Sequence, residues 1–270
     1  RVSASMIIDC GMQVVAKTRG ILFFVAVVAA TVFFSYFNSR STEVRLMTYN
    51  VRNAIGTDGV TDYGRVASVI SHYDPDVVAL QELDSMTRRS SGRDLLACLS
   101  AATGMKATWA RAIAFDGGSY GIGVLSRETP LSVRVVPLPG SEEERRLLVV
   151  EFRDYVFACT HLSLDAGDRL ASAELIASAA SGWEKPFFVA GDWNARPGDP
   201  LVRAMEADFE ILSDPSCPTW PADAPSECLD YVAVMRGAAR RLRVVDAAVC
   251  GEPVASDHRP VVVTVDFAAE

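Results

Sequence analysis

Lysine and histidine are scarce in this sequence. The lysines are Lys17, Lys106 and Lys185, and the three histidines are His72, His161 and His258. Acidic residues outnumber basic ones by 34 to 26, which gives a net charge of −8 at pH 7. A chain with this balance has no global attraction to a long polyanion, so nucleic acid is not the favoured partner.

The composition of a disordered or fibrous protein is also absent. Half of the 270 residues are hydrophobic and 22% are charged, so the chain can bury the core of one large domain or two small ones. No internal repeat or low-complexity run interrupts the sequence after Val44. We therefore predict one domain over residues 44–270.

The six cysteines show no CxxC pair, which argues against a zinc site, and they are too few for a disulfide scaffold of this size. Cys217 and Cys228 lie at the two ends of a proline-rich segment and are the one pair that spacing suggests. A disulfide and two separate thiols both remain open, because the sequence does not give the Cα separation.

An uncharged run near the N-terminus predicts a membrane anchor or an export signal. Residues 21–37 (ILFFVAVVAATVFFSYF) follow Lys17 and Arg19 and precede a polar stretch. A buried helix of a soluble core is the alternative, but such a helix normally shows a polar face. No Ala-x-Ala pattern precedes the polar exit, which favours an uncleaved anchor over a cleaved signal.

This segment predicts where the chain is located. The basic residues before it indicate that residues 1–20 are cytoplasmic and that residues 21–37 enter the membrane. The domain that follows is then held at the cell membrane outside the cytoplasm, or is secreted if the segment is cleaved.

From Val44 onward, short strand-like runs alternate with a few helical patterns. Asp62 can cap a helix whose apolar positions are Val66, Val69, Ile70 and Tyr73, and Asp74-Pro75 ends it. Helices are also predicted at 93–102, 167–181 and 199–207. Strands are predicted at 44–51, 76–80, 105–115, 121–127, 131–136, 146–152, 155–160, 187–190, 229–235, 242–250 and 261–267. Many strands with few helices indicate an α/β fold of two packed sheets flanked by helices.

Several apolar strands end in polar residues that are costly to bury. They form six blocks: Tyr49-Asn50, Gln81-Glu82, Thr160-His161, Gly191-Asp192-Trp193-Asn194, Leu229-Asp230-Tyr231 and Ser256-Asp257-His258. Strand ends bring side chains from distant parts of a sequence into one cleft. Two of the three histidines belong to these blocks, whereas His72 ends a helix and is assigned to the surface.

The blocks, in this order and together with Gly123-Val124-Leu125-Ser126-Arg127, resemble the endonuclease/exonuclease/phosphatase superfamily over roughly residues 44–268. The resemblance implies a four-layer α/β sandwich with two mixed β-sheets packed face to face. It also implies hydrolysis of a phosphate ester with a divalent metal, usually Mg²⁺, with Mn²⁺ as the alternative.

The same resemblance assigns roles residue by residue. His258 accepts a proton from the attacking water or hydrogen-bonds the phosphate, and Asp230 fixes its tautomer. Asp192 orients the water, while Asn194 and His161 bind the substrate phosphate as donors. The implied metal ligand is Glu82, supported by Asn50, with Asp257 as an additional metal or water ligand.

The substrate is less defined by the sequence. A phosphate mono- or diester in a phospholipid headgroup or a small phosphorylated metabolite fits the acidic charge best, and the predicted enzyme is a monomer with residues 21–37 in the membrane. The alternative is an exported or membrane-tethered endonuclease acting on DNA or RNA. In that alternative, the nucleic acid would bind in a groove lined by Arg236, Arg240, Arg241 and Arg243.

Two further alternatives carry less weight. The Trp-Cys-Asp-Arg block of inositol phosphatases is not found, because Cys228-Leu229-Asp230-Tyr231 has neither Trp nor Arg. A catalytically inactive binding module is disfavoured because every expected catalytic position is filled. The four tryptophans could form a lipid- or carbohydrate-contacting surface, but only composition supports this: Trp193 is expected near the site, and Trp109, Trp183 and Trp220 are expected in the core.

Overall fold

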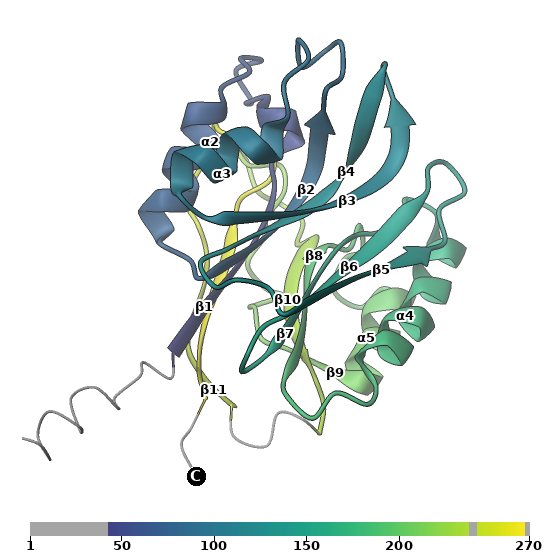
Figure 1. The fold of residues 1–270 in the computed structure, drawn as a ribbon. Helices are drawn as coiled ribbons and strands as arrows, with labels where there is room; N and C mark the ends of the chain where they lie inside the picture. Colours follow the sequence, from purple (N-terminus) through teal and green to yellow (C-terminus); the bar gives the residue numbers. More distant parts are fainter. Residues whose placement is uncertain (1–42, 238–241, 268–270) are drawn as a thin grey trace, which may run out of the picture. The chain divides into compact units, whose positions relative to one another are not determined.

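The computed structural model describes residues 43–237 and 242–267, and it contains two six-stranded β-sheets with helices on their outer faces (Figure 1). The predicted membrane segment 21–37 lies outside the described residues, as do Arg240 and Arg241 of the predicted groove. Within the described part of the chain, no helix is long and apolar enough to cross a membrane.

The first sheet has the order β11-β12-β1-β2-β4-β3. Its β1 and β2 are parallel, and every other neighbouring pair is antiparallel. The strands are β1 (Glu43–Asn50), β2 (Val77–Ser85), β3 (Lys106–Phe115), β4 (Gly118–Ser126), β11 (Leu242–Val249) and β12 (Val261–Phe267).

The second sheet has the order β5-β6-β7-β8-β10-β9, and its β7 and β8 are the parallel pair. The strands are β5 (Ser132–Leu138), β6 (Arg145–Glu151), β7 (Val156–His161), β8 (Phe187–Asp192), β9 (Phe209–Ile211) and β10 (Asp230–Met235). Each sheet therefore has one parallel pair among antiparallel neighbours.

Three apolar layers hold the sheets and helices together. One layer lies between the sheets, where Leu46 and Val124 of the first sheet and Phe157 and Phe188 of the second are fully buried. The second layer lies beneath α2 (Tyr63–Tyr73) and α3 (Leu95–Thr103), and the third beneath α4 (Ala166–Ala180) and α5 (Pro200–Asp208). The predicted four-layer α/β sandwich is confirmed (Figure 1).

The helices begin and end where the sequence signals indicate. The side chain of Asp62 accepts a hydrogen bond from the Arg65 amide at the start of α2, and Asp74 ends that helix in the left-handed conformation before Pro75. Asp94 and Asp165 cap α3 and α4 in the same way. These caps satisfy amides that a helix end otherwise leaves without partners.

Some local features differ from the sequence prediction. The three-residue strand β9 and a short 3₁₀ turn at Arg52–Ala54 were not predicted, because neither is long enough to show a periodic pattern. Cys217 and Cys228 are separate free thiols, as are the other described cysteines. Trp220 was expected in the core, but it lines a surface pocket.

Candidate active site

Asn50 and Glu82 meet at one end of the first sheet because β1 and β2 are parallel neighbours. The amide nitrogen of Asn50, Nδ2, donates to Glu82 Oε1 at 3.0 Å and to Asp192 Oδ2 at 3.0 Å. Its amide oxygen accepts from the Arg52 backbone N–H at 3.1 Å, which fixes the side chain's orientation. Asn50 therefore links carboxylates from both sheets.

Glu82 lies in an irregular part of β2, where the register with β4 shifts between Leu80 and Leu83. Its φ of 58° is in the left-handed region, which costs a non-glycine residue about 1–2 kcal/mol. Backbone strain of this kind is concentrated at functional sites. The shift places the Glu82 carboxylate beside Asn50, whereas the neighbouring Gln81 stays buried and contacts Thr48 and Cys159.

Asp192 is the common contact of the site. Its Oδ2 lies 3.6 Å from His161 Nε2 and 3.7 Å from His258 Nε2, in addition to accepting from Asn50. Its Oδ1 accepts from the backbone N–H of Asn194 at 2.9 Å. Asn194 takes a φ of 48°, which asparagine tolerates well, and one of its amide hydrogens is bonded to the Leu162 carbonyl.

His258 is held by Asp230, which begins β10. His258 Nδ1 lies 2.9 Å from Asp230 Oδ2, and the same oxygen accepts from the Thr219 hydroxyl at 2.6 Å. Both His258 and Asp230 are buried. With Nδ1 directed at Asp230, His258 presents Nε2 toward Asp192 and the pocket.

His161 ends β7 and is the strand partner of Asp192 at the end of β8. Arg145 is a nearby charge that the sequence did not single out: it is buried, pairs with Glu143 at 2.9 Å, and its Nε has no hydrogen-bond partner among the described residues. His161 and Arg145 line a small cavity together with Tyr120.

Asp257 is set slightly apart from the other carboxylates. It is partly exposed, and its Oδ2 lies 3.4 Å from Arg52 Nε. The adjacent Ser256 hydroxyl donates to the Asn50 carbonyl at 2.7 Å, which ties the segment before His258 to the end of β1.

The two histidines have opposite electrostatic environments. Burial disfavours a charged imidazole and lowers the pKa of His161 to about 3, with Arg145 and His258 adding to the effect and Asp192 opposing it. Burial acts on His258 in the same direction, but the carboxylates of Asp230 and Asp192 outweigh it and raise the pKa to about 10. In the metal-free protein, His161 is neutral and His258 is a cation.

Burial also raises the pKa of the Glu82 carboxyl group. The hydrogen bond from Asn50 opposes this increase, whereas the negative charges of Asp257 and Asp192 add to it. The site thus gathers more negative charge than its own groups compensate. A bound cation would relieve that repulsion.

One group of described residues has ligand atoms spaced closely enough for a metal ion. It consists of Asp192, Asp230 and His258, whose ligand atoms all lie within 4.8 Å of one another. This group differs from the ligands predicted from the sequence. Two of its members, Asp230 and His258, are already bonded to each other through Asp230 Oδ2 and His258 Nδ1.

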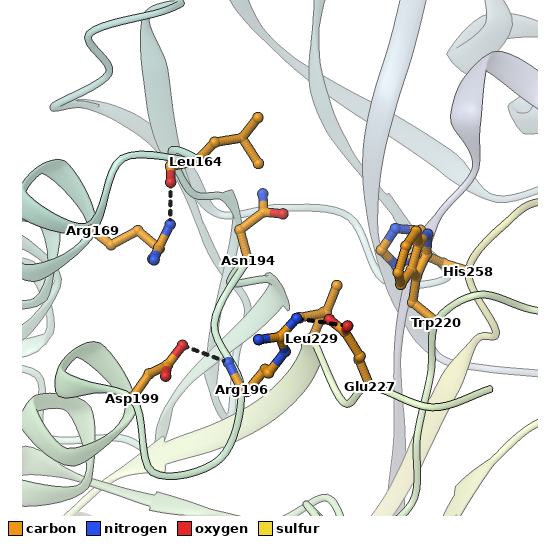
Figure 2. Close-up of a pocket in the computed structure, with 9 residues that line it drawn as sticks. All are labelled: Leu164, Arg169, Asn194, Arg196, Asp199, Trp220, Glu227, Leu229 and His258. Atoms are coloured by element: carbon orange, nitrogen blue, oxygen red, sulfur yellow. Dashed lines mark hydrogen bonds and ion pairs between the residues drawn. The ribbon is translucent and has the colours of Figure 1, made fainter.

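A pocket of about 520 Å³ opens beside His258 and Asn194. Figure 2 shows Leu164 and Arg169 on one side of the pocket, His258 and Trp220 on the other, and Asn194 between the two sides. The remaining lining residues are Arg196, Asp199, Glu227 and Leu229. A substituent on a phosphate held at Asn194 and His258 would lie in this pocket.

The structure brings most of the sequence-predicted residues into direct contact, by way of Asp192, Asn50 and His258. Asp257 does not touch this network by its side chain, which contacts Arg52 and Ser256. Sequence reasoning missed Thr219, Trp220 and Arg169. The first two lie in the loop before β10 and the third on α4, where a single sequence carries no signal that distinguishes them from ordinary surface or core residues.

Fold and site together define an α/β sandwich whose two sheets carry a carboxylate- and histidine-lined site at one end. A family model described as "Endonuclease/Exonuclease/phosphatase family" matches residues 47–258. The chain belongs to this family, and the resemblance stated from the sequence is confirmed.

Solved structures have the same fold. The endonuclease/exonuclease/phosphatase from Beutenbergia cavernae DSM 12333 is 24% identical with a TM-score of 0.70, and the match covers 85% of this chain and 72% of that one. The mannosyl-6-phosphatase of Bacteroides thetaiotaomicron VPI-5482 is 16% identical, with a TM-score of 0.65 and coverage of 83% and 100%.

A humanized D. rerio TDP2 is 20% identical, with a TM-score of 0.65 and coverage of 84% and 100%. No curated protein matches the chain. At these identities the solved structures establish the fold of this chain and leave its substrate to be argued from the site.

Proposed function

We propose that the protein is a divalent-metal-dependent phosphoesterase whose substrate is a small phosphorylated metabolite. The observation that carries this proposal is the position of Asp192, whose side chain contacts Asn50, His161 and His258 at one point between the sheets. Hydrolysis of a phosphate ester adds charge to the non-bridging oxygens, so the site must supply a cation, hydrogen-bond donors and a base.

The donor set fits Mg²⁺, and Mn²⁺ is the alternative. Hard cations of this kind prefer carboxylate oxygens and keep several waters. We assign Glu82 as the main ligand, oriented by Asn50, with Asp257 as a further metal or water ligand. This assignment leaves Asp230 and His258 as a hydrogen-bonded pair and Asp192 beside the attacking water; a cation held by Asp192, Asp230 and His258 is the alternative. When bound, the cation supplies Lewis-acid stabilisation of a phosphate oxygen.

Other side chains of the site orient the water, accept its proton and bind the phosphate. Asp192 orients the attacking water. His258 hydrogen-bonds the phosphate through Nε2 while it is protonated, and it can accept the proton of the water only after Nε2 has lost its own. Asn194 donates its second amide hydrogen to a phosphate oxygen, since the first is bonded to Leu162. His161 donates a hydrogen bond as a neutral imidazole, in accordance with its low pKa.

The lining of the pocket beside His258 favours a soluble substrate over a lipid. Four of its nine residues are charged: Arg169, Arg196, Asp199 and Glu227. Charged walls of this kind suit a small polar metabolite better than the apolar part of a phospholipid.

A nuclease is the second candidate, supported by the diversity of the family. Two of the four arginines predicted for its groove are engaged otherwise: Arg243 pairs with Asp266 at 3.1 Å, and Arg236 Nε donates to the Glu206 carbonyl. Nuclease affinity depends on Lys and Arg contacts to successive phosphates. The engaged arginines and the net charge of −8 make this candidate the weaker one.

The proposed location is the outer face of the cell membrane, with residues 21–37 as anchor, or the exterior if that segment is cleaved. The uncharged run and the preceding Lys17 and Arg19 support this proposal.

The experiment that tests the function uses the purified full-length chain with Mg²⁺ or Mn²⁺ on sugar phosphates, phospholipid vesicles, sphingomyelin, plasmid DNA and RNA across a salt range. We expect metal-dependent turnover of sugar phosphates. DNA cleavage that collapses with rising salt, with the small esters untouched, would make the protein a nuclease.

A further inference from the structure

Arg169, on α4, is an unneutralised cation in the wall of the pocket beside the active site. Its Nη1 donates to the backbone carbonyls of Ser163 and Leu164 at 3.1 Å and 2.6 Å. It forms no ion pair with a carboxylate of the described residues, and its Nε and Nη2 make no hydrogen bond among them. The side chain is half-buried, so its orientation is fixed and its remaining donors are available.

The position of Arg169 is not explained by the stability of α4. The residue lies in the first turn of that helix, after the Asp165 cap. A positive charge at a helix N-terminus is electrostatically unfavourable, because the helix dipole places positive charge there. The two carbonyl contacts instead hold the guanidinium at the wall of the pocket.

Among the other charged residues of the pocket, Arg196 and Glu227 compensate each other, and the Asp199 carboxylate accepts from a backbone N–H. Arg196 Nη2 pairs with Glu227 Oε1 at 2.7 Å, and the Arg196 backbone N–H is bonded to the Asp199 carboxylate. Trp220 contributes an aromatic ring, and Leu164 and Leu229 add apolar surface. The walls thus combine an aromatic ring, one internal ion pair, the Asp199 carboxylate and one cation with spare donors.

We propose that this pocket binds the alcohol portion of the phosphate ester and that Arg169 binds a second anionic group, a phosphate or carboxylate, on that alcohol. The proposal rests on the phosphoesterase function proposed above. With the scissile phosphate between His258 and Asn194, the alcohol crosses the pocket from the side that holds Trp220 toward Arg169 on the other side (Figure 2). A guanidinium with free Nε and Nη2 can bind such an anion with paired hydrogen bonds.

The substrate class is therefore a small, polar, doubly anionic ester, such as a sugar bisphosphate or a phosphorylated sugar acid. A pocket of about 520 Å³ admits a sugar-sized group. The ion-paired Arg196 and Glu227 offer donors and acceptors to hydroxyl groups, and the Trp220 ring can pack against the ring of the sugar.

The test measures inhibition of bis(p-nitrophenyl) phosphate hydrolysis by the full-length protein with Mg²⁺. The inhibitors are two matched pairs: glucose 6-phosphate with glucose 1,6-bisphosphate, and fructose 6-phosphate with fructose 1,6-bisphosphate. We expect at least one bisphosphate to bind about tenfold or more tightly than its monophosphate, as one charge-assisted contact allows. Arg169→Gln should reduce that ratio to threefold or less, and Arg169→Lys should retain more of it.

Arg134→Gln is the matched control, because it removes one positive charge from an exposed arginine on β5 whose described hydrogen bond is to the Ala179 carbonyl. It should leave both the activity and the ratio unchanged. A ratio near one in the wild type for both pairs, or a ratio that Arg169→Gln does not lower, overturns the inference alone. A protein that does not hydrolyse the reporter with Mg²⁺ or Mn²⁺ overturns the proposed function, and the inference falls with it.

Discussion

Asp230 concentrates its contacts on one oxygen. Its Oδ2 lies 2.9 Å from His258 Nδ1 and accepts from the Thr219 hydroxyl at 2.6 Å, whereas its buried Oδ1 has no hydrogen-bond partner in the part of the chain that the structure describes. The orientation of His258 therefore depends on a single carboxylate oxygen and on the loop that supplies Thr219.

His258 and Asp230 should act as one catalytic unit. A base and the residue that orients it lose most of their effect when either is removed. We predict that the double variant His258→Ala with Asp230→Ala has nearly the same kcat/KM as His258→Ala alone. Steady-state kinetics on one substrate decides the matter, and losses that multiply would show that the two residues act separately.

Thr219→Val should weaken both the fold and the site. It removes a buried hydroxyl that donates to Asp230 and accepts from the Leu229 amide, and a lost buried hydrogen bond costs about 1–3 kcal/mol. The free energy of unfolding measured with urea and kcat should both fall in Thr219→Val. Thr219→Ser keeps the hydroxyl, so both quantities should stay close to the wild-type values. Equal behaviour of the two variants would refute this role.

His161 should make the metal-free protein sensitive to acid. Its pKa is about 3 in the folded state, below the 6.5 of a free histidine. The unfolded chain then binds the extra proton, so the free energy of unfolding falls as the pH drops from 6.5 toward 3. With chelator present, the wild type should lose roughly 1–3 kcal/mol more than His161→Asn over that window. The free energy of unfolding is measured by urea at each pH. An equal loss in the two proteins between pH 6.5 and pH 3 would contradict the burial of a neutral His161.

His258 should have the opposite effect at alkaline pH. Its folded-state pKa of about 10 lies above the 6.5 of a free histidine, so the native protein holds the extra proton. Its stabilising contribution is present below pH 6.5 and is lost as the pH rises toward 10. The wild type should lose stability across that range more steeply than His258→Asn, again in chelator. A wild-type slope no steeper than that of the variant would rule out the charged pair.

The predicted anchor can be tested by location. Residues 21–37 should keep the full-length chain in the membrane fraction, and protease that reaches the outer face of the membrane should digest the domain. Recovery of the intact full-length protein in the cytosolic fraction would refute both parts of this prediction.

Most individual helices and strands were predictable from the sequence because their signals are periodic and local, whereas the four-layer sandwich was predicted from the family resemblance. The apolar run before Gln81-Glu82 and the Asp62 cap each predict an element that the structure contains. Strand β9 was missed because three residues at a sheet edge show no period. Sheet order depends on which strands pair, and that is set by packing between distant segments.

Only some residues of the site could be predicted from the sequence, for a similar reason. Asn50, Asp192 and His258 belong to blocks whose order resembles a known family, so their gathering could be expected. Thr219 and Arg169 carry no such motif, and their contacts with Asp230 and with the pocket arise from the path of a loop and the turn of a helix. The left-handed backbone of Glu82 is likewise invisible in the sequence.

Turnover of Glu82→Gln against wild type, with Mg²⁺ and with chelator, tests whether hydrolysis depends on a metal held by Glu82. The control is Glu174→Gln, which removes one negative charge from an exposed residue of α4. We predict that Glu82→Gln stays folded and loses a factor of about 100 or more in kcat/KM, while the control keeps wild-type activity. Full activity of Glu82→Gln in chelator would show that hydrolysis requires neither Glu82 nor a metal.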